Sequence, residues 1–192
     1  MPEADPRYET QEVLASGGMA TVWRAYDRRL DREVALKRPH PRPPGDPINS
    51  RFEREARAAA GLSHPNLVTV YDSGVDADGP FLVMELVDGP TLGEASPDPL
   101  SAMRIGAALA DALAAVHQAG IGHRDIKPQN VLLSNRGPLL TDFGIAHSAG
   151  DTRPLTQPGT TFTTPSYAAP EVLSGIRSAG PAKAMKTSEI PE

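Results

Sequence analysis

The sequence predicts an α+β fold in two lobes, an antiparallel sheet with one helix followed by a mainly helical region. Between residues 9 and 86, short apolar stretches of strand length are separated by turns rich in Gly, Asp and Pro. Between residues 99 and 119, apolar side chains instead recur every three or four positions, as on one face of an α-helix. The 192 residues are enough for one ordinary domain or two small lobes.

The first lobe is expected to contain five strands and one helix. The turn-prone Ser16-Gly17-Gly18 divides an alternating stretch and predicts a β-hairpin. Ser50 and Glu53 form a capping box for the helix, which is expected to end at Gly61. Asp72-Ser73-Gly74 and Asp78-Gly79-Pro80 indicate turns between the last two strands. The expected elements are a hairpin at 9–26, a strand at 32–38, a helix at about 51–62, and strands near 67–71 and 81–86.

The second lobe begins with a long helix. Asp98 is a predicted N-cap, Pro99 suits the first helical position and Gly120 ends the helix, which gives a length of about 30 Å. Strand-like stretches follow at 131–133 and 139–141, and no apolar periodicity remains after Glu171. The apolar stripe of the helix consists of Ile105, Leu109, Ala112, Leu113 and Val116.

Composition excludes several classes of function. The chain has no Cys, which removes disulfides, thiol nucleophiles and Cys-based zinc sites. A net charge of −5 without a Lys/Arg cluster disfavours nucleic acid as a partner. No run of about 18 apolar residues occurs, and the first residues lack the features of a leader. We therefore expect a cytoplasmic protein with no membrane segment in this chain.

Short motifs that suit phosphate chemistry occur in order along the chain. The hairpin glycines would let backbone N–H groups approach phosphate oxygens closely, although this signal is weak alone. Alone, Lys37 and Glu55 are better interpreted as solvated charges, and His123 as a hydrogen-bonded core histidine. Their ordered co-occurrence could hardly arise by chance. The motifs are the Gly17-Gly18 hairpin, Val34-Ala35-Leu36-Lys37, Glu55, His123-Arg124-Asp125-Ile126-Lys127-Pro128-Gln129-Asn130, Asp142-Phe143-Gly144 and Ala169-Pro170-Glu171.

This set resembles the signature of protein kinases, in particular the eukaryotic-like Ser/Thr kinases of bacteria, over about residues 8–173. The resemblance implies a bilobal kinase-like fold. Its N-lobe, residues 8–87, would hold the five-stranded antiparallel sheet and one helix. Residues 88–173 would form an incomplete, mainly helical C-lobe, and 174–192 a disordered tail. It further implies transfer of the γ-phosphoryl group of ATP to Ser or Thr hydroxyls of proteins, with Mg²⁺ or Mn²⁺.

The resemblance also assigns roles to individual residues. Lys37 would contact the α- and β-phosphates and pair with Glu55. Asp125 would orient the attacking hydroxyl, and Lys127 would neutralise the γ-phosphate and mark the Ser/Thr subclass. Asn130 and Asp142 would bind the metal ion, for which oxygen ligands are suitable. The nucleotide would lie among Leu14, Ser16, Gly17, Gly18, Val22, Ala35, Met84, Glu85, Val87 and Leu132, with Ala15 and Ala20 where the family pattern has glycines.

Residues 145–169 resemble an activation segment rich in hydroxyl groups. Thr164 would contact Asp125 and Lys127, and Thr163 stands where the family has glycine. Autophosphorylation is predicted because a phosphate in this segment could pair with Arg124 and order it. A homodimer would allow this reaction in trans. The predicted acceptors are Thr156, Thr160 and Thr161.

The chain departs from the family pattern after Glu171. A complete kinase continues with several helices, whereas 21 residues follow here. The helix at 99–119 would then lack part of its apolar cover. The alternative function is therefore a truncated, inactive kinase fragment that at most binds nucleotide or a protein partner. A small-molecule phosphotransferase is disfavoured by the combination of Lys127, D-F-G and A-P-E.

Overall fold

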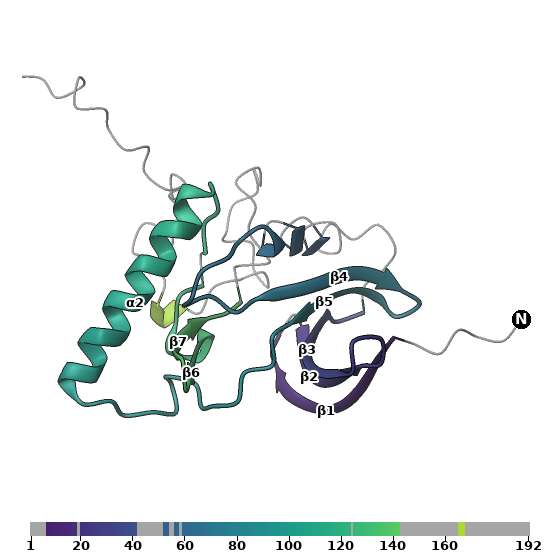
Figure 1. The fold of residues 1–192 in the computed structure, drawn as a ribbon, viewed down its shortest axis with the longest axis horizontal. Helices are drawn as coiled ribbons and strands as arrows, with labels where there is room; N and C mark the ends of the chain where they lie inside the picture. The colour runs from purple at the N-terminus through teal and green to yellow at the C-terminus, as the bar shows by residue number, and fades with distance from the viewer. Residues whose placement is uncertain are drawn as a thin grey trace, which may run out of the picture.

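A computed structural model describes most of the chain between residues 7 and 142. Figure 1 shows a sheet at one end, a long helix at the other, and a short two-stranded sheet between them. The described residues are 7–18, 20–41, 52–53, 56–57, 59–123, 125–142 and 165–167.

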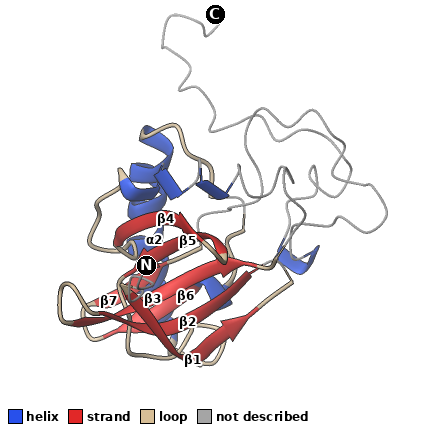
Figure 2. Cartoon of the chain, turned by 90° about the vertical axis from the view of Figure 1, so that its right-hand side faces the viewer, coloured by secondary structure: helices blue, strands red, loops and turns tan. Residues whose placement is uncertain are grey.

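The large sheet has five antiparallel strands in the order β1-β2-β3-β5-β4. Figure 2 shows these strands as a curled sheet. After β3, the described residues between 52 and 60 are helical. The predicted five-stranded sheet with one helix is therefore confirmed. The strands are β1 (Tyr8–Ser16), β2 (Ala20–Asp27), β3 (Arg32–Pro39), β4 (Val70–Asp76) and β5 (Gly79–Met84).

The predicted bounds of β4 and β5 were wrong. Asp72-Ser73-Gly74 was expected to be a turn but lies inside β4, paired with β5 after an irregularity between Val70 and Asp72. A Cβ at Gly74 would come within 2.7 Å of the Phe81 ring, so glycine lets that ring pack over the strand. The turn falls instead at residues 77–78, and β5 ends at Met84 rather than at residue 86.

The long helix α2 (Pro99–Gln118) follows its sequence signals closely. The Asp98 carboxylate accepts hydrogen bonds from the backbone N–H groups of Leu100 and Ser101, at 3.0 and 3.1 Å. This satisfies two N–H groups that have no partner within the helix. Gly120 takes a positive φ of 75° just beyond the end. The predicted start, stop and capping residue of this helix are confirmed.

A second sheet pairs β6 (Val131–Ser134) with β7 (Gly137–Leu140), as the strand-like stretches predicted. The loop at 64–69 joins β7 to the large sheet. The backbone N–H of Val68 donates to Leu140 O at 3.0 Å, and Leu140 N donates to Asn66 O at 2.9 Å. The Asn66 side chain donates to Pro138 O at 2.8 Å. These bonds place β7 at a fixed distance from β4 and β5.

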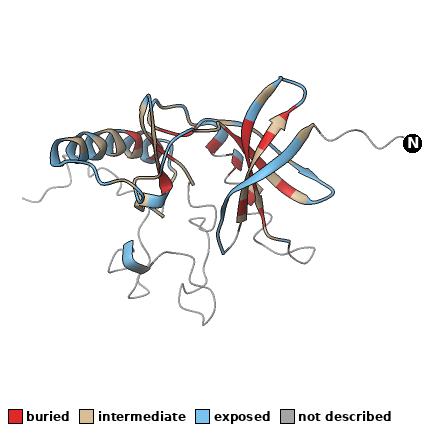
Figure 3. Cartoon of the chain, turned by 90° about the horizontal axis from the view of Figure 1, so that it is seen from below, coloured by how far each residue is buried: buried red, intermediate tan, exposed pale blue. Residues whose placement is uncertain are grey.

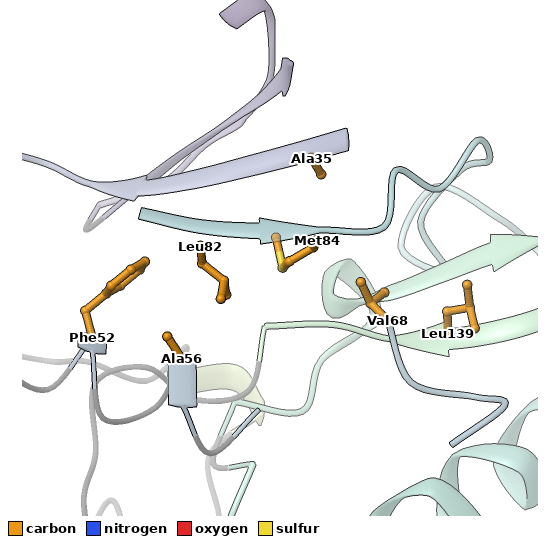
Figure 4. Close-up of a cluster of buried hydrophobic side chains, with 7 residues drawn as sticks. All are labelled: Ala35, Phe52, Ala56, Val68, Leu82, Met84 and Leu139. Carbon is orange, nitrogen blue, oxygen red and sulfur yellow. The ribbon is translucent and has the colours of Figure 1, made fainter. Parts of the chain in front are cut away.

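Three groups of buried apolar side chains form the core. One lies between the helical residues after β3 and the large sheet, and Figure 4 shows its members. A second unites α2 with β6 and β7 through Ala112, Val116, Val131 and Leu140. The third, around Leu36, lies on the other face of the sheet.

Much of α2 is exposed, as the pale surface of this helix in Figure 3 shows. Ala112 and Val116 of its predicted apolar stripe are fully buried, whereas Ile105, Leu109 and Leu113 are only partly buried. By length and composition alone α2 could cross a membrane, a test that core helices of water-soluble proteins also pass. This is weak evidence, so the absence of a membrane segment stays a prediction.

A network of charges attaches the start of β1 to the rest of the sheet. The Arg7 guanidinium donates two hydrogen bonds to the buried Asp27 carboxylate, at 3.0 and 2.9 Å. It also donates to Asp72 at 2.6 Å, as does the Tyr8 hydroxyl. The bonds from Arg7 hold the pKa of Asp27 below its usual value, although burial opposes this.

Replacing Asp27 with Asn should lower the free energy of unfolding by about 2 kcal/mol, because it weakens charge-assisted hydrogen bonds at a buried position. Since the folded-state pKa of Asp27 is depressed, its contribution is present above about pH 4 and is lost as the pH falls through the folded value. Urea unfolding of both proteins from pH 7 down to pH 3 measures this. The difference should shrink with acid.

The exposed pair of Arg28 and Glu9 offers a matched control. Glu9→Gln should change the free energy of unfolding by less than about 1 kcal/mol. Equal effects of Asp27→Asn and Glu9→Gln would contradict a special role for the buried carboxylate.

Candidate active site

The loop between α2 and β6 carries the polar residues that the sequence singled out. His123 is almost fully buried, and its Nε2–H donates to the backbone carbonyl of Thr141 at 2.9 Å. Burial lowers the pKa of His123 below its usual value, although the bond to Thr141 opposes this, so the imidazole is neutral near pH 7. The predicted structural role of His123 agrees with this position.

Asp125, Lys127 and Asn130 are brought together by this loop. The Lys127 ammonium lies 2.8 Å from the Asp125 carboxylate. The buried Asn130 side chain donates to both the backbone carbonyl and the carboxylate of Asp125, at 2.7 and 3.0 Å. A short 3₁₀ helix at Pro128–Asn130 allows this return. Asp125 is thus held from two sides, and its side chain keeps 25% of its surface exposed.

Lys37 and Asp142 meet although they lie 105 positions apart. The Lys37 Nζ donates to Asp142 Oδ1 at 2.6 Å. Burial would raise the pKa of Asp142, but the charge and hydrogen bond of Lys37 outweigh it and leave that pKa lowered. Asp142 has a left-handed backbone with a φ of 58°, which Asp tolerates better than most residues. This carboxylate is therefore ionised beside the loop between α2 and β6.

The chemistry of Asn130 and Asp142 fits a magnesium ion. The backbone N–H of Thr141 donates a hydrogen bond to the backbone carbonyl of Asn130 at 2.9 Å. Because Thr141 directly precedes Asp142, this bond brings the backbones of Asn130 and Asp142 close together. No group of three or more His, Cys, Asp or Glu side chains forms a metal cage among the described residues. Mg²⁺ is commonly held by one or two protein oxygen ligands together with substrate phosphates. One carboxylate and one amide oxygen suit that pattern.

The residues predicted to enclose the adenine lie in one apolar cluster. Ala35 and Met84 are buried partners on β3 and β5, and Val22, Val87 and Leu132 pack against the same cluster. Figure 4 shows Ala35 and Met84 near each other in that cluster. Leu14, also predicted here, has 43% of its surface exposed at the end of β1. The flat face of an aromatic base could cover such a side chain.

The backbone of Glu85 is only partly available for the predicted contact. Its N–H donates to Thr69 O at 2.8 Å, so only its carbonyl can accept from a nucleotide. Its side chain pairs with Arg136, which lies between β6 and β7. This ion pair connects the segment after β5 to the second sheet.

The glycine hairpin is closed by a turn. Gly17 N donates to Ala20 O at 3.0 Å. Among the described residues, no atom lies within 4 Å of the position that a Cβ would take at Gly18. A ligand can therefore approach the backbone of Gly18 closely on this side.

Several predicted site residues lie outside the described residues. Glu55 is among them, so the described ion pair of Lys37 is the one with Asp142, and pairing with Glu55 stays a prediction. Arg124, the acceptors Thr156, Thr160 and Thr161, and the A-P-E motif also lie there, as does the tail at 174–192. Of the predicted activation segment, only Pro165–Tyr167 is described, as a 3₁₀ turn.

Sequence reasoning missed three residues that position the site. The side chain of Asn66 donates a hydrogen bond to β7, and the backbone carbonyl of Thr141 accepts one from His123. Thr21 lies buried at the base of the glycine hairpin. The turn signal His64-Pro65-Asn66 could have indicated a side chain that caps a strand, since Asn commonly bonds to nearby backbone. A backbone carbonyl such as that of Thr141 leaves no signal in the sequence.

Comparison with known proteins places this chain in a family. Residues 8–185 match the protein kinase domain. The chain is 44% identical over 183 residues to a probable serine/threonine-protein kinase of Streptomyces coelicolor, SCO3848, and covers 27% of that protein. It is 43% identical to the serine/threonine-protein kinase PknL of Mycobacterium tuberculosis. The matches cover 88% and 87% of this chain, but the chain spans only 27% and 43% of these relatives.

Solved structures of kinases superimpose on this chain. The PknI kinase domain of M. tuberculosis superimposes with a TM-score of 0.67 at 29% identity, over 90% of this chain and 65% of that one. The apo form of PpkA-294 gives 0.64 at 28% identity, over 75% and 60%. Rad53, solved in complex with AMP-PNP, gives 0.69 at 25% identity, over 88% and 43%. The predicted α+β, bilobal kinase-like fold is confirmed.

Replacing His123 with Phe should lower the free energy of unfolding by about 1–3 kcal/mol, because the Thr141 carbonyl loses its donor. The folded-state pKa of His123 is depressed, so the wild type loses stability as the pH falls below about 6.5, whereas the Phe variant lacks this loss. Denaturant unfolding between pH 8 and pH 5 should therefore show the gap between the two proteins narrowing.

The exposed His117 near the end of α2 provides the control. His117→Gln should change the free energy of unfolding at pH 8 by less than about 0.5 kcal/mol, as expected for an exposed residue. A gap between wild type and His123→Phe that stays constant down to pH 5 would contradict a buried neutral imidazole.

Proposed function

The chain belongs to the protein kinase family, among the bacterial serine/threonine kinases, and from this we propose that it transfers the γ-phosphoryl group of ATP to Ser or Thr hydroxyls of proteins. The observation that carries the proposal is the placement of two hydrogen-bonded groups, Lys37 with Asp142 and Asp125 with Lys127 and Asn130. The backbone bond from Thr141, the residue before Asp142, to Asn130 O links them. Phosphoryl transfer requires mainly positioning and charge neutralisation, which this arrangement provides.

In the proposed reaction, the substrate hydroxyl oxygen forms a bond to the γ-phosphorus while the bond from that phosphorus to the β–γ bridging oxygen breaks. ADP leaves with the electron pair of the broken bond. Asp125 accepts the hydrogen bond of the attacking hydroxyl and receives its proton. Lys127, 2.8 Å from Asp125, balances charge on the transferred group, and Lys37 contacts the α- and β-phosphates.

ATP and a divalent cation are the proposed cofactors. Asn130 and Asp142 would hold Mg²⁺, with Mn²⁺ as a substitute, and the ion supplies neutralisation of phosphate charge when bound. Val22, Ala35, Met84, Val87 and Leu132 would enclose the adenine. The Rad53 structure is a complex with AMP-PNP, an ATP analogue, which supports a nucleotide as a ligand of this chain.

The protein substrate is proposed only as a class, a protein with accessible Ser or Thr. We also propose that a homodimer phosphorylates its own Thr156, Thr160 or Thr161 in trans, and that the protein acts in the cytoplasm, where ATP and Mg²⁺ are available. These proposals rest on family membership and on the hydroxyl-rich sequence of residues 145–169.

Asp125→Asn should reduce transfer of radiolabelled phosphate to the chain and to a generic basic protein by about 10²- to 10⁴-fold, because the hydroxyl loses its proton acceptor. Lys37→Met should also abolish detectable transfer, since it removes the charge that holds Asp142 and the phosphates. The exposed Glu9→Gln variant should transfer phosphate as the wild type does.

Thermal melts with and without Mg-ATP separate the two functional alternatives. Transfer that disappears in both variants supports the enzyme. A melting temperature raised by Mg-ATP without any transfer would favour the inactive, nucleotide-binding fragment, an alternative that the named relatives do not favour. If Mg-ATP produces neither phosphate transfer nor a thermal shift, both the active enzyme and the nucleotide-binding fragment are contradicted.

Incubation with Mg-ATP should add phosphate to the segment that holds Thr156, Thr160 and Thr161, and none should appear in the Asp125→Asn protein. Mass spectrometry of the digested chain measures this. If the reaction occurs in trans, mixing the Asp125→Asn protein with active wild type should restore phosphorylation of the Asp125→Asn protein. Complete absence of phosphate in this segment of the wild type would contradict autophosphorylation here.

A further inference from the structure

Three polar side chains from consecutive strands are joined at the base of the glycine hairpin. The Ser16 Oγ lies 3.1 Å from Thr21 Oγ1, and Thr21 Oγ1 lies 3.1 Å from His40 Nε2. Ser16 ends β1, Thr21 follows the first residue of β2, and His40 comes directly after β3. The three side chains therefore form one hydrogen-bonded row across the end of the sheet.

The middle member of this row is shielded from water. Thr21 has 8% of its surface exposed, whereas Ser16 is exposed and His40 is partly exposed. One hydroxyl can donate once and accept twice, so Thr21 can satisfy both neighbours at the same time. A hydrogen bond shielded from solvent at such a position is stronger than one on an open surface.

Packing does not secure the tip of the hairpin. A Cβ at Gly17 would meet only Ala20 O, at 4.0 Å, and one at Gly18 would meet nothing within 4 Å among the described residues. Glycine also leaves the backbone conformationally free. Ser16 and Thr21 are the last paired residues of β1 and β2 before the tip. Their side-chain bond thus adds to the last rung of the strand ladder.

We propose that Thr21 and His40 are positioning residues for the phosphates of the nucleotide. By tying the hairpin base to β3, they hold Gly18, whose backbone is open on the side where a Cβ would point, where it can approach phosphate oxygens. Lys37 lies on the same strand β3, opposite Val22 of β2. The row therefore fixes the hairpin relative to the strand that carries the phosphate-binding lysine. This inference rests on the proposed function.

The test compares variants that break the row with variants that keep it. Thr21→Val preserves shape but removes the hydroxyl, and His40→Phe removes the ring nitrogen. Thr21→Ser and His40→Gln keep a hydrogen-bonding group. Loss of one such bond should raise the KM for Mg-ATP about three- to tenfold. The kcat should change less than about twofold, because interactions lost equally from ground and transition states leave kcat unchanged.

Thr10→Val is the matched control, the same chemical change at the other end of β1, opposite Ala25. It should leave the KM unchanged. Amide hydrogen exchange of residues 14–22 without nucleotide gives a second measurement, and Thr21→Val should exchange faster there than Thr10→Val. Because this readout needs no ATP, it reports on the row itself.

The outcomes separate this inference from the proposed function. A raised KM and faster exchange in Thr21→Val and His40→Phe, both restored in Thr21→Ser and His40→Gln, support the inference. A wild type that binds Mg-ATP while Thr21→Val binds it equally well overturns the inference alone. A wild type that neither binds nor uses Mg-ATP overturns the proposed function, and the inference with it.

Discussion

Docking of the 64–69 loop on β7 is the constraint on which the rest of the site depends. Asn66 and Val68 contribute three hydrogen bonds to β7, and these tie the second sheet to β4 and β5 of the large sheet. Through β7 the constraint reaches Thr141 and Asp142, the residues that follow it. Lys37 comes from the large sheet and Asp142 from the second, so their 2.6 Å contact requires the two sheets to keep their spacing. The electrostatics of the site are a result of backbone docking.

The loop between α2 and β6, which carries His123 to Asn130, depends on a similar arrangement at shorter range. His123 and Asn130 each bond to Thr141, one through its side chain and one through its carbonyl. The loop is thus held at both ends by the backbone of a residue with no chemical role of its own. Because Asn130 also holds Asp125, the carboxylate is positioned before any substrate arrives. Such preorganisation avoids reorganisation during the reaction.

Sequence reasoning was most accurate where the signal is local. The capping Asp98, the Pro at the next position and the glycine stop predicted α2 because each acts within one turn of the helix. The ordered motifs predicted a shared site, and the structure pairs Lys37 with Asp142 and joins Asp125 to Lys127 and Asn130. The course of β4 was mispredicted because glycine is typical of turns. At Gly74, however, glycine is needed inside the strand, where the ring of Phe81 on the neighbouring strand packs against it. The docking of Asn66 and the row through His40 were missed for the same reason, since each joins residues from different elements.

The left-handed backbone of Asp142 has a consequence for which amino acids this position can hold. At a φ of 58°, Asn is accommodated nearly as well as Asp, whereas longer or β-branched residues are disfavoured. The position is therefore restricted twice, once by the chain conformation and once by the charge that meets Lys37. Glutamate satisfies the charge and fails the conformation, and asparagine does the reverse. Of these three residues, only aspartate meets both demands. We therefore expect few other amino acids at this position, whether or not its side chain contacts the nucleotide.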